Sequence, residues 1–285
     1  MPSRVAIAAI RRVGAGPART DQDLVAVEAP LAIVVRSAAG GASRPLGIVM
    51  RTPGDDRELV LGLLYSEGLI RTKDDVVSCA VADPAETGET ADVTLAASVD
   101  LDARFTGRAL AGTSACGLCG RLAVEHVNAL RRGPARPDLT WSAELVSALP
   151  AALRAAQTVF AETGGLHAAG LFDRDGRLLG IREDVGRHNA VDKLVGAALD
   201  AAALPAVESL VVVSGRVAYE IVQKAVMAGV AGVVAVGAPS SLAVDAARAT
   251  GLILIGFARD GRFNVYAEHD RVLPASPGAP HPAAS

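Results

Sequence analysis

The second half of the chain alternates short apolar runs with longer amphipathic runs. The short runs are rich in β-branched residues and predict buried strands, whereas the amphipathic runs predict helices. Strands that are apolar throughout belong to a sheet covered on both faces, with the helices as crossovers. The predicted elements are a helix at 142–160, a hairpin of strands 167–172 and 178–181, helix 187–199, strand 210–213, helix 219–228, strand 233–236, helix 241–250 and strand 252–255.

The first half has a weaker pattern that favours strands. Apolar runs at 31–35, 46–50, 76–81 and 93–95 predict short strands. A helix is predicted to start with Thr52 as N-cap and Pro53 in its first turn, and to stop near Gly68. Arg51 and Asp55 could contact a ligand, but we favour solvated charges that cap the start of that helix. Residues 1–24 show no periodicity and predict a loose arm.

A proline-rich, charged stretch at 131–140 predicts a linker. We therefore expect an α/β protein with a smaller, mainly β N-terminal domain at 1–135, an α/β ligand-binding domain at 136–271 and a disordered tail at 272–285. The 285 residues are 51% hydrophobic, which is enough for a large core. A net charge of −3 argues against nucleic acid as the main partner. The early apolar run Val5–Ile10 is too short for a signal or membrane segment, so we predict a cytoplasmic protein without a membrane partner.

Two of the three cysteines form a Cys-x-x-Cys motif, Cys116 and Cys119, in the small-residue segment 112–120. The following apolar periodicity places them at a helix start, where the helix dipole favours the reactive thiolate. A disulfide framework is disfavoured in so long a chain with so few cysteines. Half of a zinc site remains an alternative, although no second Cys-x-x-Cys supplies further ligands. We favour a reactive sulfur carrier or redox pair, and interpret Cys79 as a buried, inert cysteine in a strand.

Four polar, glycine-containing loops follow predicted strands, at 182–189, 214–216, 237–241 and 256–262. In parallel sheets such loops gather at the carboxyl edge, where ligands bind. Glycines that expose backbone N–H groups, with arginines nearby, are what a phosphate or pyrophosphate requires. The candidate binding residues are Arg187, Ser214, Gly215 and Arg216, together with His188, which serves either as an acid or base or to orient a neighbour.

These segments together resemble the FdhD family, the formate dehydrogenase accessory sulfurtransferases. The resemblance covers nearly the whole chain except its termini. Ala218, Ile221 and Gly237 depart mildly from the family pattern. The motifs that carry it are Glu28-Ala-Pro, Met50-Arg-Thr-Pro-Gly-Asp, Cys116-Gly-Leu-Cys119-Gly, the stretch from Arg182 to Lys193, Ser214-Gly-Arg, Gly256-Phe-Ala-Arg and Asn264-Val-Tyr266.

The resemblance implies a function. Members of this family take sulfur from a cysteine desulfurase as a cysteine persulfide and pass it to the molybdenum or tungsten of the bis(molybdopterin guanine dinucleotide) cofactor, which the formate dehydrogenase catalytic subunit needs. Cys116 would carry the persulfide, with Cys119 as its helper. The resemblance also implies a cytidine-deaminase-like, three-layer C-terminal domain and a homodimer, with no permanent metal. The implied cofactor-binding stretch is Phe257, Ala258, Arg259, Asp260, Gly261 and Arg262.

Three alternatives stay open at this point. Zinc-dependent deamination needs His-x-Glu, but Ala168 and Ala169 follow His167, so the catalytic glutamate is missing. A cofactor chaperone without sulfur chemistry would use the loops but not the cysteines. A general thiol–disulfide oxidoreductase is weaker, because no strand leads directly into the Cys-x-x-Cys helix.

Overall fold

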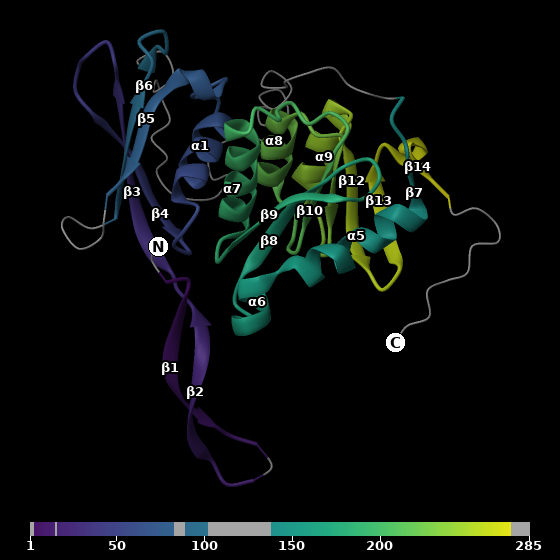
Figure 1. Cartoon of the computed structure of the whole chain (residues 1–285). Coiled ribbons are helices and arrows are strands. Elements are labelled where there is room, and N and C mark those ends of the chain that lie inside the picture. Colours follow the sequence, from purple (N-terminus) through teal and green to yellow (C-terminus); the bar gives the residue numbers. More distant parts are fainter. Residues whose placement is uncertain (1–2, 15, 83–88, 102–137, 275–285) are drawn as a thin grey trace.

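The computed structural model describes residues 3–14, 16–82, 89–101 and 138–274, which form two lobes (Figure 1). The N-terminal lobe contains a four-stranded sheet, a projecting hairpin and one long helix. Its elements are β1 (Val5–Arg12), β2 (Arg19–Ala26), β3 (Ala29–Ser37), β4 (Arg44–Arg51), α1 (Asp56–Ser66), η1 (Lys73–Asp75), β5 (Val76–Val81) and β6 (Thr90–Leu95).

The C-terminal lobe has a mixed six-stranded sheet in the order β13-β12-β11-β10-β8-β9. Strands β10, β11 and β12 are parallel to one another, whereas β8, β9 and β13 pair antiparallel with their neighbours. The elements of this lobe are β7 (Trp141–Ser142), α5 (Ala143–Ala156), α6 (Thr158–Thr163), β8 (His167–Phe172), β9 (Leu178–Asp184), α7 (Arg187–Asp200), β10 (Leu210–Val213), α8 (Tyr219–Ala228), β11 (Gly232–Ala235), α9 (Ser241–Thr250), β12 (Ile253–Arg259), β13 (Arg262–Ala267), η2 (His269–Arg271) and β14 (Val272–Leu273).

Helices cover both faces of this sheet, as the apolar strands predict. Helices α7, α8 and α9 lie on one face and α5 on the other (Figure 1). Neighbouring residues of one strand point to opposite faces: Val211 packs with the α7–α9 layer, and Val212 packs with Leu149 of α5. The three-layer arrangement is therefore confirmed, while the likeness to cytidine deaminases stays a prediction.

The N-terminal sheet has the order β4-β3-β6-β5, and its strands contain the predicted apolar runs. The inward side chains Leu31, Ile33 and Val93 are buried against the layer that contains α1. Helix α1 then packs along α7, so that one apolar core runs from the N-terminal sheet into the C-terminal lobe.

The crossing of α1 and α7 depends on two glycines. A Cβ on Gly62 would lie 1.8 Å from the carbonyl oxygen of Asp192, and one on Gly196 would lie 1.9 Å from that of Glu58. The two helix backbones thus touch directly, which no larger residue permits at either position.

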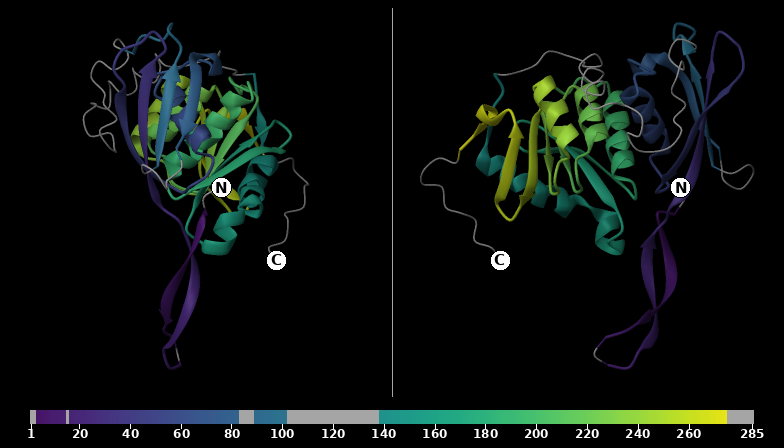
Figure 2. Two further views of the ribbon diagram at one scale, coloured as in Figure 1. Left: turned by 60° about the vertical axis from the view of Figure 1, so that its left-hand side comes forward. Right: turned by 180° about the vertical axis from the view of Figure 1, so that it is seen from behind.

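The prediction of a loose arm at 1–24 is wrong, because β1 and β2 form a twisted hairpin that projects from the N-terminal lobe (Figures 1 and 2). Ile7 pairs with Leu24, and Arg12 donates to Asp21 at 2.6 Å across the strands. Both strands are mostly exposed and have no buried face, so the sequence carries no alternation that would predict them.

The predicted start of the first helix is also wrong. Helix α1 begins at Asp56 and its N-cap is Asp55, because the backbone and hydroxyl of Thr52 are bonded to the C-terminal lobe instead. Arg51 is not solvated: only 1% of its side chain is exposed, and it pairs with Asp56 at 2.7 Å and with Glu89. This arginine closes the sheet edge against the helix rather than facing water.

Two boundaries differ in the C-terminal lobe. The predicted helix 142–160 is divided into α5 and α6 at Gln157, because the Glu183 carboxylate accepts the N–H groups of Val159 and Phe160 and starts a new helix there. Val272 and Leu273, placed in the predicted tail, form β14 and pair with β7. The rest of the tail from 275 onward, and most of the predicted linker, lie outside the described residues.

Candidate functional site

The carboxyl ends of β10, β11 and β12 lie side by side at one edge of the sheet. The N–H of Gly237 donates to the carbonyl oxygen of Gly215 at 3.1 Å, and that of Phe257 donates to the carbonyl oxygen of Gly237 at 3.1 Å. Three of the four predicted loops are therefore adjacent, as expected for parallel strands.

The glycines in these loops allow close backbone approach. A Cβ on Gly237 would lie 2.9 Å from the backbone nitrogen of Arg216, and one on Gly215 would lie 3.2 Å from Nδ1 of His167. Side chains at these positions would push the loops apart, so the sheet edge stays compact and rich in backbone groups.

The fourth predicted loop, 256–262, is mostly a hairpin. Strand β12 continues to Arg259 and β13 starts at Arg262, with Asp260 and Gly261 in the turn at φ 53° and 72°. Two consecutive residues with positive φ form the tight turn that suits a two-residue hairpin. The apolar run ends at Ile255, which hid the remainder of the strand from sequence analysis.

Phe257 interrupts this hairpin at a β-bulge. Its φ is 54°, in the left-handed region that bulky residues rarely adopt, and its side chain is 40% exposed. Backbone strain of this kind is enriched at functional sites, which makes Phe257 a candidate.

A cavity of about 560 Å³ lies between this sheet edge and the α5–α6 layer. Its α5–α6 side includes Phe160, whose ring carries the Arg154 guanidinium 4.0 Å from its centroid. Gln157 is buried there, and its Nε2 has no hydrogen-bond partner among the described residues. The sheet side contributes four of the lining residues that sequence or resemblance predicts: Ser214, Ala258, Arg259 and Asp260.

Arg154, Gln157, Phe160 and His167 also line the cavity, although the sequence did not predict them there. The first three belong to an amphipathic helical pattern, which is typical of a covering helix, and only folding brings them to the sheet edge. The one available signal was Gln157, a polar residue within an apolar stretch.

His167, which lines the cavity, lies near Arg187 and His188 at the same edge. Gly215 approaches both His167 and Arg187, whose Cδ would lie 3.8 Å from an added Cβ. Burial lowers the pKa of His167, and the charges of Arg187 and Arg216 lower it further. Burial, Arg187 and Lys224 lower the pKa of His188 to about 4, although Glu220 opposes them. Both imidazoles are therefore neutral at pH 7, and the positive charge resides on the arginines.

The other polar residues of the 182–189 segment have structural partners, which corrects their prediction as a phosphate loop. Arg182 pairs with Glu58, and Glu183 caps α6. Asp184 binds Lys193 at 2.7 Å, and Asn189 donates to the carbonyl oxygen of Met50 at 2.8 Å. A sequence cannot distinguish such bonds between lobes from contacts to a ligand.

The predicted sulfur site, Cys116 and Cys119, lies outside the described residues. Cys79 is on β5 as predicted, but its side chain is half-buried; burial raises the pKa of its thiol, which disfavours the thiolate. No group of three or more histidine, cysteine or acidic side chains in the described ranges could hold a metal ion. No described helix has the length and apolar character that a membrane crossing needs.

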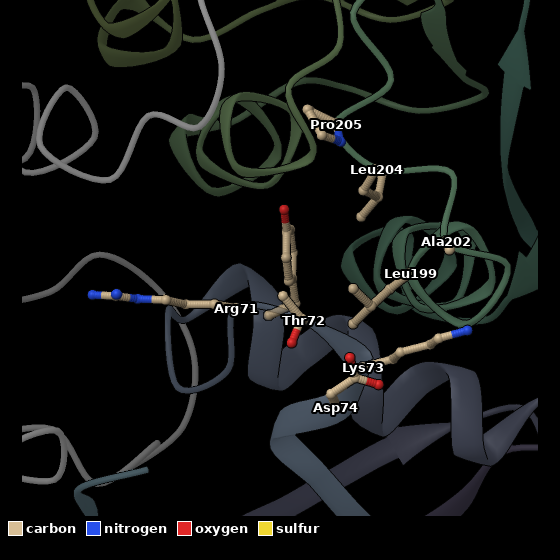
Figure 3. Close-up of a pocket in the computed structure, with 9 residues that line it drawn as sticks. Arg71, Thr72, Lys73, Asp74, Leu199, Ala202, Leu204 and Pro205 are labelled. Atoms are coloured by element: carbon tan, nitrogen blue, oxygen red, sulfur yellow. The ribbon is translucent and has the colours of Figure 1, made fainter. Parts of the chain in front are cut away.

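A second cavity, of about 380 Å³, lies where α1 and η1 meet the end of α7 (Figure 3). Its wall is apolar at Leu199, Leu204 and Pro205. The charged side chains of Arg71 and Lys73 point away from one another (Figure 3). Among the described residues that the sequence predicts for a binding site, none lines this cavity.

Comparison with known proteins identifies the family. The chain belongs to the FdhD/NarQ family, whose sequence model matches residues 26–273. It is 47% identical over 268 residues to the sulfur carrier protein FdhD of Streptomyces coelicolor, covering 92% of this chain and 93% of that protein. It is 48% identical over 275 residues to the protein of the same name from Nocardia farcinica, covering 94% and 95%.

A solved structure supports the fold. A protein from Desulfotalea psychrophila, assigned as a formate dehydrogenase accessory protein, superposes with a TM-score of 0.72 at 24% identity, covering 95% of this chain and all of that one. The sequence model and the relatives confirm the family that the motifs predict, and this structure confirms the fold.

Proposed function

We propose that this protein is a cytoplasmic sulfurtransferase that serves formate dehydrogenase. Cys116 accepts sulfur as a persulfide from a cysteine desulfurase, and the protein transfers it to the molybdenum or tungsten of bis(molybdopterin guanine dinucleotide), its substrate. The protein acts as a homodimer. Relatives that are 42–48% identical and named sulfur carrier proteins support this proposal.

The observation that carries the proposal is the convergence of three glycine-containing strand ends beside a cavity of about 560 Å³. Small residues and arginines at such an edge suit a pyrophosphate, and an adjacent cavity with an aromatic wall suits a nucleobase. A guanine nucleotide has both parts.

The residues fit the nucleotide end of this substrate. The buried Gln157 amide lacks a partner among the described residues and can bond a base edge, while Phe160 offers a stacking surface. Asp260 can accept from the N–H groups of guanine. Arg259, which lines the cavity, together with Arg187 and Arg216 near Gly215, supplies the charge that a diphosphate requires.

The sulfur chemistry follows from thiolate attack. The Cys116 thiolate attacks the outer sulfur of the desulfurase persulfide, the S–S bond breaks, and the desulfurase cysteine leaves as a thiolate. Attack of Cys119 on the Cys116 persulfide then releases the sulfur as hydrosulfide and leaves a disulfide between the two cysteines. The two thiols supply the electrons that reduce the sulfur.

Calorimetric titration with GDP, the nucleotide end of the substrate, tests the binding part. We expect saturable binding that Arg259→Ala weakens about tenfold or more, because a charge-assisted contact is lost. Arg174→Ala, which removes the same charge from an exposed turn, should bind like the wild type. Absence of GDP binding, or equal affinity in wild type and Arg259→Ala, would contradict the proposed site.

A further inference from the structure

We propose that Glu183 and Asp184, adjacent at the end of β9, are positioning residues for the two sides of the nucleotide site. Side chains of neighbouring strand residues point to opposite faces of a sheet. One carboxylate therefore reaches the α5–α6 layer, and the other reaches the α7 layer and the N-terminal lobe. This inference rests on the proposed function.

Glu183 fixes the base side. Its side chain is buried, and its carboxylate accepts the N–H of Val159 at 3.0 Å, the N–H of Phe160 at 2.8 Å and the hydroxyl of Thr158 at 3.4 Å. These bonds hold the first turn of α6 against the sheet. Since Phe160 belongs to that turn and Gln157 precedes it, the aromatic wall of the cavity takes its position from Glu183.

Asp184 fixes the phosphate side. Its fully buried carboxylate accepts the N–H of Gly186 at 2.8 Å and the side-chain amide of Asn189 at 2.9 Å, which sets the turn before Arg187. The same carboxylate pairs with Lys193 at 2.7 Å and accepts the N–H of Thr52 at 3.1 Å. The start of α7 is thereby held to both lobes.

The two carboxylates should therefore affect different parts of the ligand. Glu183→Gln turns an amide donor toward the N–H groups of α6 and loosens the base wall. Asp184→Asn turns an amide donor toward the N–H of Gly186 and loosens the turn before Arg187. Loss of the Asp184 negative charge would by itself strengthen pyrophosphate binding. Loss of its positioning role would weaken pyrophosphate binding. A lower affinity of Asp184→Asn for pyrophosphate therefore indicates positioning and not a simple charge effect.

The test is titration of each variant with guanosine and, separately, with inorganic pyrophosphate. We expect Glu183→Gln to lose about tenfold in guanosine affinity with little change for pyrophosphate, and Asp184→Asn to show the reverse. Asn189→Ala removes one Asp184 contact more gently and should share the pyrophosphate-specific loss if Asp184→Asn does not fold. Glu162→Gln, the same chemical change at an exposed position of α6, should match the wild type.

Three results would overturn this inference. Equal losses for both ligands in each variant would show a general loss of structure, and unchanged affinities would show that neither carboxylate positions the site. If the wild type binds guanosine or pyrophosphate but the variants show no such split, only this inference fails. A wild type that binds neither ligand nor GDP overturns the proposed binding site as well.

Discussion

Substitution of Gly196 by alanine tests the close backbone contact between α1 and α7. The added Cβ would lie 1.9 Å from the Glu58 carbonyl oxygen, against an ordinary contact of at least 3.4 Å, so α1 and α7 must separate by about 1.5 Å. The three nearest atoms, the carbonyl oxygen and carbon of Glu58 and the nitrogen of Gly62, all belong to the backbone, so none can rotate away. A gap of about 0.5–1 Å already loses a quarter to a half of each dispersion contact. The buried residues Leu59 and Leu194 near this crossing would lose such contacts.

The magnitude follows from two opposing effects. Alanine gains about 1 kcal/mol over glycine in a helix, whereas overpacking a core costs about 1–3 kcal/mol and occasionally more. Because the clash is with backbone, we expect a net loss of about 2 kcal/mol, or a melting temperature lower by about 4–8 °C. Differential scanning calorimetry measures it.

A matched control is Gly180→Ala, whose Cβ would meet only Leu194 at 3.8 Å, an ordinary contact. It should melt close to the wild type. The reasoning is refuted if Gly196→Ala melts within about 1 °C of the wild type, because its Cβ would then have room that the close helix crossing denies.

Three further predictions concern buried charge, strain and pH. Lys224→Met leaves the Asp192 carboxylate buried without the ammonium that bonds it at 2.8 Å, and urea unfolding should show a loss of about 3–5 kcal/mol; unchanged stability would contradict this. Phe257→Gly relieves positive-φ strain and should raise stability by about 1 kcal/mol while weakening GDP binding; lower stability would argue against strain. Because the pKa of His188 is lowered from 6.5 to about 4, its contribution to stability is complete above pH 6.5 and is lost as the pH falls toward 4. For this side chain, 35% exposed, we expect a loss of about 1 kcal/mol between about pH 7 and pH 5, and a His188→Gln variant with equal pH dependence would refute it.

Elements with a strong local period are predictable from the sequence. Strand β10 and helix α8 have the predicted bounds. The first is a fully apolar run and the second an amphipathic run, and such local patterns determine an element without contacts from distant residues. The break at Gln157 was not predictable, since it depends on Glu183, which is distant in the sequence. The β1–β2 hairpin was not predictable, because its strands are mostly exposed and have no apolar face that would give a period of two.

The candidate site also has a part that the local sequence predicts and a part that depends on distant contacts. Parallel strands place Ser214, Gly215 and Gly237 at one edge, which the strand pattern alone predicts. The aromatic and amide wall at Phe160 and Gln157 depends on how α5 and α6 pack, and no local pattern encodes that packing. Sequence analysis also assigned to a ligand several polar groups that the structure uses to join the two lobes.

Intact mass spectrometry after incubation with a cysteine desulfurase and cysteine is the most direct test of the sulfurtransferase proposal. The wild type should gain one sulfur atom, which reductant removes, and Cys116→Ala should gain none while still binding GDP. If the wild type gains no sulfur while the desulfurase turns over, the transferase proposal is wrong, and a cofactor chaperone without sulfur chemistry takes its place.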